Sequence, residues 1–242
     1  MPKTFSKGKQ TLIRRRKKRK TSFKKPKLRI QRTWLKSTLG LPPTLNVLFK
    51  YVYYGNFSAS TTSTSENKFN LNSCYDPDAT GVGNQPRYYD QLCTLTLYNV
   101  CHVNSVRYKI KAVNKATHDA QVMVLLGGPN TTSPTSNTNV TYHSELPNSQ
   151  LRTLTSVGTN KSVTVFKGSS KIWPLVSSSK QQYSMSRTNY SHNYNNNPTI
   201  KAHLSVICAD DPNGSSGCNV DGYITIWYSC TLSQLAVDVA QS

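Results

Sequence analysis

The stretch NSVRYKIKAV, residues 104–113, alternates apolar and charged side chains with a period of two. Successive side chains of a β-strand point to opposite faces of a sheet, so one face of this segment is apolar and the other is basic. The apolar face comprises Val106, Tyr108, Ile110 and Ala112, and the opposite face comprises Arg107, Lys109 and Lys111. The stretch therefore predicts a strand with one buried face and one solvated, cationic face.

Strand patterns recur along the chain from residue 44 onward. Clear ones span residues 44–57, 120–128, 161–168, 199–210 and 223–232, and weaker ones span 67–72, 95–102 and 150–157. A helical pattern occurs only at 87–98. Strands without alternating helices indicate antiparallel sheets, and the long polar loops between them favour a jelly roll over an up-and-down barrel. The sequence predicts an all-β fold, a single eight-stranded antiparallel jelly roll over residues 44–242.

The N-terminal segment, residues 1–43, differs sharply from the rest in charge. Its first 36 residues hold sixteen of the thirty Lys and Arg residues, and the first acidic residue of the chain is Glu66. Residues 37–242 hold the other fourteen basic residues and all ten acidic ones, so their net charge is only +4. Like charges repel and this segment has little apolar surface to bury, so we expect a disordered basic arm that binds a polyanion.

The arm contains two overlapping signals. The compact run from Arg14 to Lys20 is typical of a sequence that a host nuclear-import receptor binds. The same charges neutralise phosphate without reading base sequence. The candidate nucleic-acid-binding residues of the arm are Arg14, Arg15, Arg16, Lys17, Lys18, Arg19, Lys20, Lys24, Lys25, Lys27, Arg29 and Arg32. The strand face of Arg107, Lys109 and Lys111 is a further candidate, with an ordinary solvated face as the alternative.

Motifs for catalysis are missing from the sequence, which predicts no enzymatic activity and no cofactor. The five histidines are scattered, and no Cys/His spacing matches a zinc site, so no metal ligand is assigned. His203 is expected to be solvated on the polar face of its strand. The acidic pairs Asp76/Asp78 and Asp210/Asp211 are read as turn formers, with a calcium site as the alternative.

Membrane insertion is not expected, because no stretch approaches the eighteen apolar residues of a spanning helix and the N-terminus lacks a secretory signal. The six cysteines are expected to be reduced thiols. A disulfide between Cys208 and Cys218, which flank a turn-rich segment, is the less favoured alternative.

Residues 69–100, FNLNSCYDPDATGVGNQPRYYDQLCTLTLYNV, resemble a segment of the capsid proteins of circovirus-like viruses, which have small circular single-stranded DNA genomes. The family segment has an Asp-Pro, two spaced glycines and a Gln-Pro, followed by an aromatic-Asp-x-Leu and a Tyr that leads into a strand. The matching positions are Asp76, Pro77, Gly81, Gly83, Gln85, Pro86, Tyr89, Asp90, Leu92 and Tyr98.

This resemblance implies a jelly roll of the viral capsid type that assembles into a small icosahedral homo-oligomer of sixty copies, with the arm inside. The implied cargo is a circular single-stranded DNA genome, and the implied locations are the virion and, during assembly, the host nucleus. Sixty arms would neutralise roughly a thousand phosphates. Two alternatives stay open: a capsid of a small RNA or satellite virus, and a cellular nucleic-acid-binding protein with a basic tail.

Overall fold

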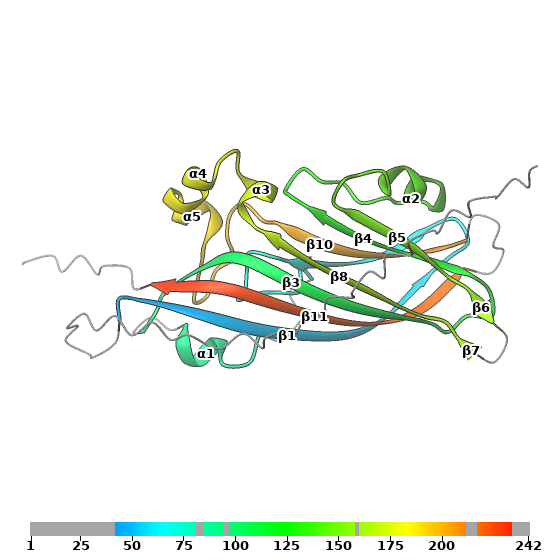
Figure 1. Cartoon of the computed structure of the whole chain (residues 1–242), viewed down its shortest axis with the longest axis horizontal. Coiled ribbons are helices and arrows are strands. Elements are labelled where there is room, and N and C mark those ends of the chain that lie inside the picture. The colour runs from blue at the N-terminus through cyan, green and yellow to red at the C-terminus, as the bar shows by residue number, and fades with distance from the viewer. Residues whose placement is uncertain (1–41, 81–84, 94–96, 158–159, 212–216, 234–242) are drawn as a thin grey trace, which may run out of the picture. The chain divides into compact units, whose positions relative to one another are not determined.

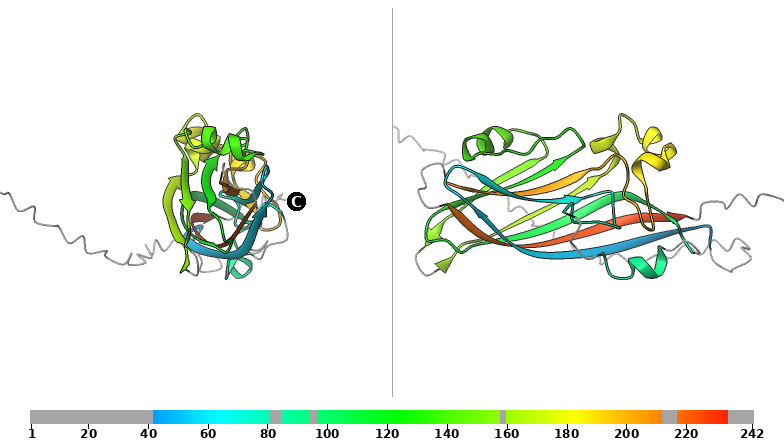
Figure 2. Two further views of the ribbon diagram at one scale, coloured as in Figure 1. Left: turned by 90° about the vertical axis from the view of Figure 1, so that its right-hand side faces the viewer. Right: turned by 180° about the vertical axis from the view of Figure 1, so that it is seen from behind.

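The computed structural model describes residues 42–80, 85–93, 97–157, 160–211 and 217–233. Residues 1–41 of the expected arm lie outside these ranges. The described residues form two antiparallel sheets that face one another (Figures 1 and 2).

The first sheet contains the long strands. Its order is β1-β11-β3-β8, and every neighbouring pair is antiparallel. The bounds are β1 Thr44–Ala59, β11 Cys218–Ser233, β3 Val100–Asn114 and β8 Val163–Lys171, with the short β9, His192–Asn193, pairing with one end of β3.

The second sheet has the order β2-β10-β4-β5, again antiparallel throughout. The bounds are β2 Thr64–Asn70, β10 His203–Asp210, β4 Ala120–Gly127 and β5 Ser149–Leu154, and a separate ribbon pairs β6 Ser156–Val157 with β7 Asn160–Lys161. The helices are short: α1 Tyr89–Leu92, α2 Asn137–His143, α3 Trp173–Val176, α4 Lys180–Met185 and α5 Arg187–Tyr190.

The order of the strands defines the fold. If the eight long strands are counted from one to eight along the chain, the two sheets read 1-8-3-6 and 2-7-4-5. The first strand therefore pairs with the last, and consecutive strands alternate between the sheets except at the single hairpin of β4 and β5. This is the arrangement of a jelly roll, and it confirms the predicted fold class.

The core lies between the two sheets and follows the predicted alternation. In the first sheet Ile110 pairs with Ile224 on one side and with Phe166 on the other, and all three side chains are fully buried. Phe69 and Leu204 face them from the second sheet and belong to the same apolar cluster. Apolar burial of this kind, roughly 25 cal/mol per Å² removed from water, is the main favourable contribution to folding.

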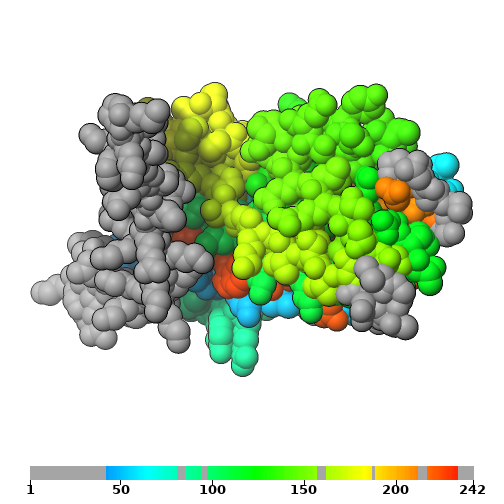
Figure 3. Space-filling view, turned by 45° about the vertical axis from the view of Figure 1, so that its right-hand side comes forward, coloured from blue at the N-terminus to red at the C-terminus, as the bar shows by residue number. Residues whose placement is uncertain are grey.

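A second apolar cluster covers the outer face of the second sheet. Met123 and Leu125 of β4 and Ile207 of β10 pack there against Val140 of α2. This explains why residues 120–127 are apolar on both faces of the strand. Figure 1 shows α2 beside β4 and β5, and Figure 3 shows the green surface that this part of the chain forms.

Three expectations about local structure were wrong. A helix was expected only over 87–98, but α2, α3, α4 and α5 form elsewhere in the body. Among the described residues of 87–98 only α1 is helical, because Tyr88 has a left-handed φ of 71° before it and Cys93 leaves the helical region after it. His203 is half-buried rather than solvated, and its Nδ1 has no partner among the described residues. Burial, with Lys68 and Lys201 nearby, lowers the pKa of His203 to about 4.

Replacing Ile110 by Ala tests the core. The change leaves a cavity between three strands, so we expect the free energy of unfolding to fall by about 2–5 kcal/mol, measured by urea denaturation followed by circular dichroism. Lys109→Ala, on the opposite face of the same strand, is the matched control and should change it by no more than about 0.5 kcal/mol. Equal losses for both variants would contradict the assigned faces.

The half-buried His203 predicts a loss of stability in mild acid. Its pKa is lower in the folded chain than the usual value near 6.5, so the unfolded chain binds the proton more readily and the folded state loses stability as the pH falls from about 6.5 towards 4. His203→Gln should flatten this part of a urea-midpoint profile measured against pH. An unchanged profile would exclude His203 as its source.

Candidate nucleic-acid interface

The outer face of the first sheet carries the predicted cationic stripe. Arg107, Lys109 and Lys111 of β3 are all exposed, while the residues that alternate with them are buried in the core. The structure therefore places these three candidates on one open face, as the alternation predicts.

The sheet register brings further basic residues beside this stripe. Lys109 lies opposite Lys167 of β8, and Trp227 of β11 lies between Arg107 on one side and Lys50 of β1 on the other. We call the exposed side of the four strands the basic face, and its basic residues are Lys50, Arg107, Lys109, Lys111, Lys167 and Lys171. The sequence analysis missed three of these six, because only the pairing of distant strands places them together.

Asp221 is the only acidic residue in the four strands, and it is already paired. Its carboxylate lies 2.6 Å from the Lys115 ammonium group and accepts a hydrogen bond from the Asn56 side chain. Burial would raise the pKa of Asp221, but the hydrogen bonds from Lys115 and Asn56 outweigh it and hold the pKa below its usual value. Asp221 is thus paired with a lysine outside the basic face, and the four strands hold no other carboxylate for the six cations of that face.

Aromatic rings lie among these cations. Tyr54 and Tyr223 are 55% and 47% exposed, and their ring centroids are 4.8 Å apart. The ammonium group of Lys111 lies 5.6 Å from the centre of the Tyr223 ring. Exposed rings beside cations can stack on unpaired bases while the cations contact phosphates.

A hollow of about 580 Å³ opens at the other end of the same face. Trp227, Arg107 and Lys171 line it together with Leu48, Ser169 and Ser229. A half-buried indole flanked by two cations has the chemistry to hold a flat base and its phosphate.

Tyr183 and Tyr190, in the polar segment that follows β8, are not available for stacking. Tyr183 and Tyr190 are each 3% exposed, their rings contact one another at 5.2 Å between centroids, and the Tyr183 hydroxyl donates to the Val103 carbonyl. These tyrosines, which the sequence places in polar loops, pack inside the protein.

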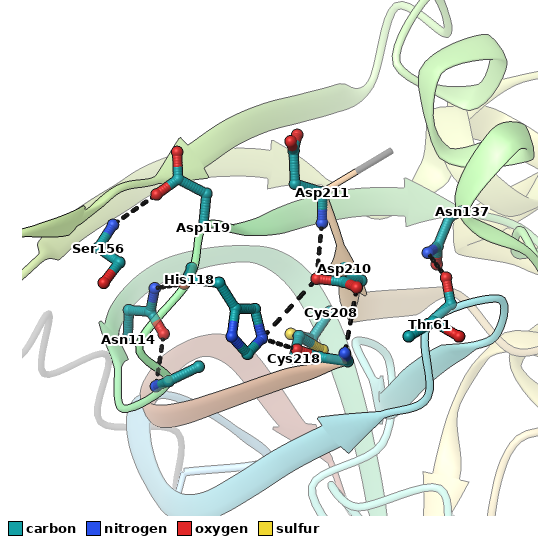
Figure 4. A network of polar contacts seen from close by, with 12 residues as sticks. Thr61, Asn114, His118, Asp119, Asn137, Ser156, Cys208, Asp210, Asp211 and Cys218 are labelled. Carbon is teal, nitrogen blue, oxygen red and sulfur yellow. Dashed lines mark hydrogen bonds and ion pairs between the residues drawn. The ribbon is translucent and has the colours of Figure 1, made fainter. Parts of the chain in front are cut away.

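The acidic pairs make different kinds of hydrogen bond. Asp78 accepts from the Thr80 amide, the local turn contact that the sequence favours, whereas Asp76 accepts from the side chain of Asn197, which is distant in the sequence. Figure 4 shows the other pair, in which the buried carboxylate of Asp210, at the end of β10, accepts from the amides of Asp211 and Gly217.

The loop that carries the family resemblance is described only in part. The Pro77 carbonyl accepts from the Asn70 amide, and the Pro86 carbonyl accepts from the Tyr89 amide at the start of α1. Asp76 and Gln85 are also described, whereas Gly81 and Gly83 lie outside the described residues, as do all the candidate residues of the arm.

The cysteines gather in two places, which their spacing in the sequence does not reveal. Cys208 and Cys218 have their sulfur atoms 2.6 Å apart, at the polar network of Figure 4. Cys74, Cys101 and Cys230 have sulfur atoms that all lie within 4.8 Å of one another in the core. Burial raises the pKa of the Cys74 thiol. Burial acts in the same direction on Cys101, but hydrogen bonds from Cys230, Cys74 and Cys93 outweigh it and lower its pKa.

Among the described residues, no helix is long and apolar enough to cross a membrane. No family model matches the chain, and no curated protein matches it.

Comparison with solved structures finds similar chains in viruses. The chain from Desmodium yellow mottle tymovirus is 13% identical, with a TM-score of 0.35, over 83% of this chain and 98% of that one. The empty head of turnip yellow mosaic virus gives 13% identity and a TM-score of 0.39, over 85% and 90% of the two chains, and rhinovirus B5 gives 11% and 0.33 over the full length of both. These scores are too low to carry an argument, so the fold rests on the strand order described above.

Removing three charges from the basic face should weaken binding to single-stranded DNA. We expect the triple variant Arg107→Ala, Lys109→Ala, Lys111→Ala to lower the slope of log affinity against log salt by about 2, since each phosphate contact contributes about 0.7. Fluorescence anisotropy of a labelled oligonucleotide across a salt series measures this slope.

The matched control removes the same charge elsewhere. Lys68, Lys180 and Lys201 lie outside the basic face, and their triple Ala variant should leave the slope close to that of the unmodified protein. Similar slopes for the two triple variants would show that only total charge matters and that the basic face is not a binding surface.

Proposed function

We propose that this chain is the capsid protein of a virus with a circular single-stranded DNA genome. Sixty copies assemble into a small icosahedral shell, and the genome binds on its inner side. The observation that carries this proposal is the asymmetry of the jelly roll: α2 and its neighbours cover the outer face of one sheet, while the other sheet presents an open face of cations and aromatic rings.

The arm and the basic face act on the same cargo. Residues 1–43 lead directly into β1, a strand of the sheet that bears the basic face. Genome phosphates are therefore bound first by the arm, from Arg14 to Arg32, and then by Arg107, Lys109 and Lys111 with their neighbours. Residues 44–242, with a net charge of only +4 after residue 36, build the wall of the shell.

Single-stranded DNA is preferred to RNA as cargo because of the run Arg14 to Lys20. A nuclear-import receptor binds such a run, and a protein that enters the nucleus meets a genome that replicates there. The protein is accordingly located in the host nucleus during assembly and in the virion afterwards. Phosphate contacts themselves do not distinguish the two nucleic acids, so an RNA capsid is the second candidate.

Electron microscopy of the purified full-length protein tests the proposal. We expect uniform closed particles with a high ratio of absorbance at 260 nm to that at 280 nm. Deletion of residues 1–36 should leave particles but lower this ratio, because sixteen cations per copy are removed.

Two further observations decide between the alternatives. Protected nucleic acid that DNase digests after disassembly supports the DNA capsid, and RNase sensitivity indicates the RNA capsid. A protein that binds nucleic acid but stays monomeric across salt and pH would contradict both and would favour a cellular nucleic-acid-binding protein.

A further inference from the structure

The buried cysteines in the core have the geometry of a metal site. The three sulfur atoms of Cys74, Cys101 and Cys230 lie within 4.8 Å of one another, and those of Cys74 and Cys230 are 3.5 Å apart. Four thiolates around a zinc ion at about 2.3 Å have sulfur–sulfur separations near 3.8 Å. The separation of 3.5 Å lies just below this value, and the limit of 4.8 Å lies above it.

Cys93 is the candidate for the fourth thiol. Its sulfur atom lies outside the group of three that are within 4.8 Å of one another, but it follows α1, is 4% exposed and belongs to the same core cluster as the other three cysteines. The imidazole of His192 lies beside Cys74, but both of its ring nitrogens are engaged. Nε2 accepts from the Cys74 amide, and Nδ1 faces the Asn72 carbonyl.

We propose that Cys74, Cys93, Cys101 and Cys230 bind one structural zinc ion per chain. The ligand set is all sulfur, which suits a soft or borderline cation and disfavours magnesium and calcium, which prefer oxygen. The site is closed: Cys74, Cys101 and Cys230 are each at most 1% exposed, so no position is open to a substrate. This inference does not depend on the proposed capsid function.

The positions of the ligands indicate what the ion stabilises. Cys101 and Cys230 lie on the adjacent central strands β3 and β11, whereas Cys74 and Cys93 belong to the connection between β2 and β3. That connection, residues 71–99, has only the four-residue α1 as regular structure among its described residues. A metal that joins this connection to the sheet adds to its few backbone hydrogen bonds with neighbouring segments, and metal binding is coupled to folding in this way.

The metal content of the full-length protein is the first test. The protein is purified under reducing conditions with zinc supplied, passed through a desalting column, and assayed by plasma mass spectrometry. Its thiols are counted with Ellman's reagent in denaturant. We expect one zinc ion per chain and six free thiols. Zinc far below one per chain overturns the proposal, and the loss of four thiols would show that the same cysteines form two disulfides instead.

Variants locate the ion. Cys101→Ser should lower zinc affinity by more than about tenfold, the least that is lost even when only a supporting group of a metal site is removed. Cys208→Ser is the matched control, since Cys208 is equally buried but belongs to the other cysteine pair, and it should retain the ion. Loss of zinc in the control but not in Cys101→Ser would place the metal elsewhere and contradict the proposal.

A third measurement applies if Cys101→Ser does not fold. Cobalt replaces zinc in the unmodified protein, and the absorption spectrum then reports the ligands. We expect intense sulfur-to-cobalt charge-transfer bands and the strong visible bands of tetrahedral cobalt. A weak octahedral spectrum without charge transfer would exclude a thiolate site.

Discussion

The pairing of β1 with β11 is the constraint on which the rest of the structure depends. It joins the first long strand to the last over sixteen residue pairs, from Thr44–Ser233 to Ala59–Cys218. Because side chains alternate with a period of two, a slip of one residue would turn Phe49 and Tyr51 out of the core and bring their neighbour Lys50 in. The same register that buries these rings therefore places Lys50 beside Trp227 on the outer face. The basic face is a geometric consequence of forming the core.

The two sheets use their outer faces differently, and the difference is physical. Leu125 and Ile207 on the second sheet would be costly to leave in water, so α2 and its neighbours cover them. On the first sheet many of the corresponding positions are lysine, arginine, serine, threonine or asparagine, which keep their hydration. The apolar and aromatic side chains between them, such as Leu48, Val52 and Tyr54, are exposed. One sheet thus contributes both of its faces to stability, and the other has a face free to bind a ligand.

The sequence predicts those properties that local alternation controls. The faces of residues 104–113 follow from the pattern alone, and the strand order fits the predicted jelly roll. The prediction that His203 is solvated was wrong, because a period of two shows which side chains share a face of the strand but not what covers that face. Lys50 and Lys167 lie on other strands, and only the pairing register of those strands places them on the basic face. The four core cysteines come from separate elements, so their spacing along the chain carries no metal motif, and the signal for them exists only in the folded protein.

Charge is distributed in a way that assembly would require. Of the fourteen basic residues after residue 36, six lie on the basic face, which leaves eight against ten acidic residues for the rest of that part of the chain. Identical copies that pack side by side repel one another if their contacting surfaces carry one sign of charge. If the basic face binds a polyanion, as proposed, the eight other basic residues and the ten acidic ones leave the rest of the body close to neutral, which limits this repulsion. In the proposed shell, the cations of the open sheet therefore attract phosphate, and the small net charge of the rest of the body keeps the repulsion between neighbouring copies low.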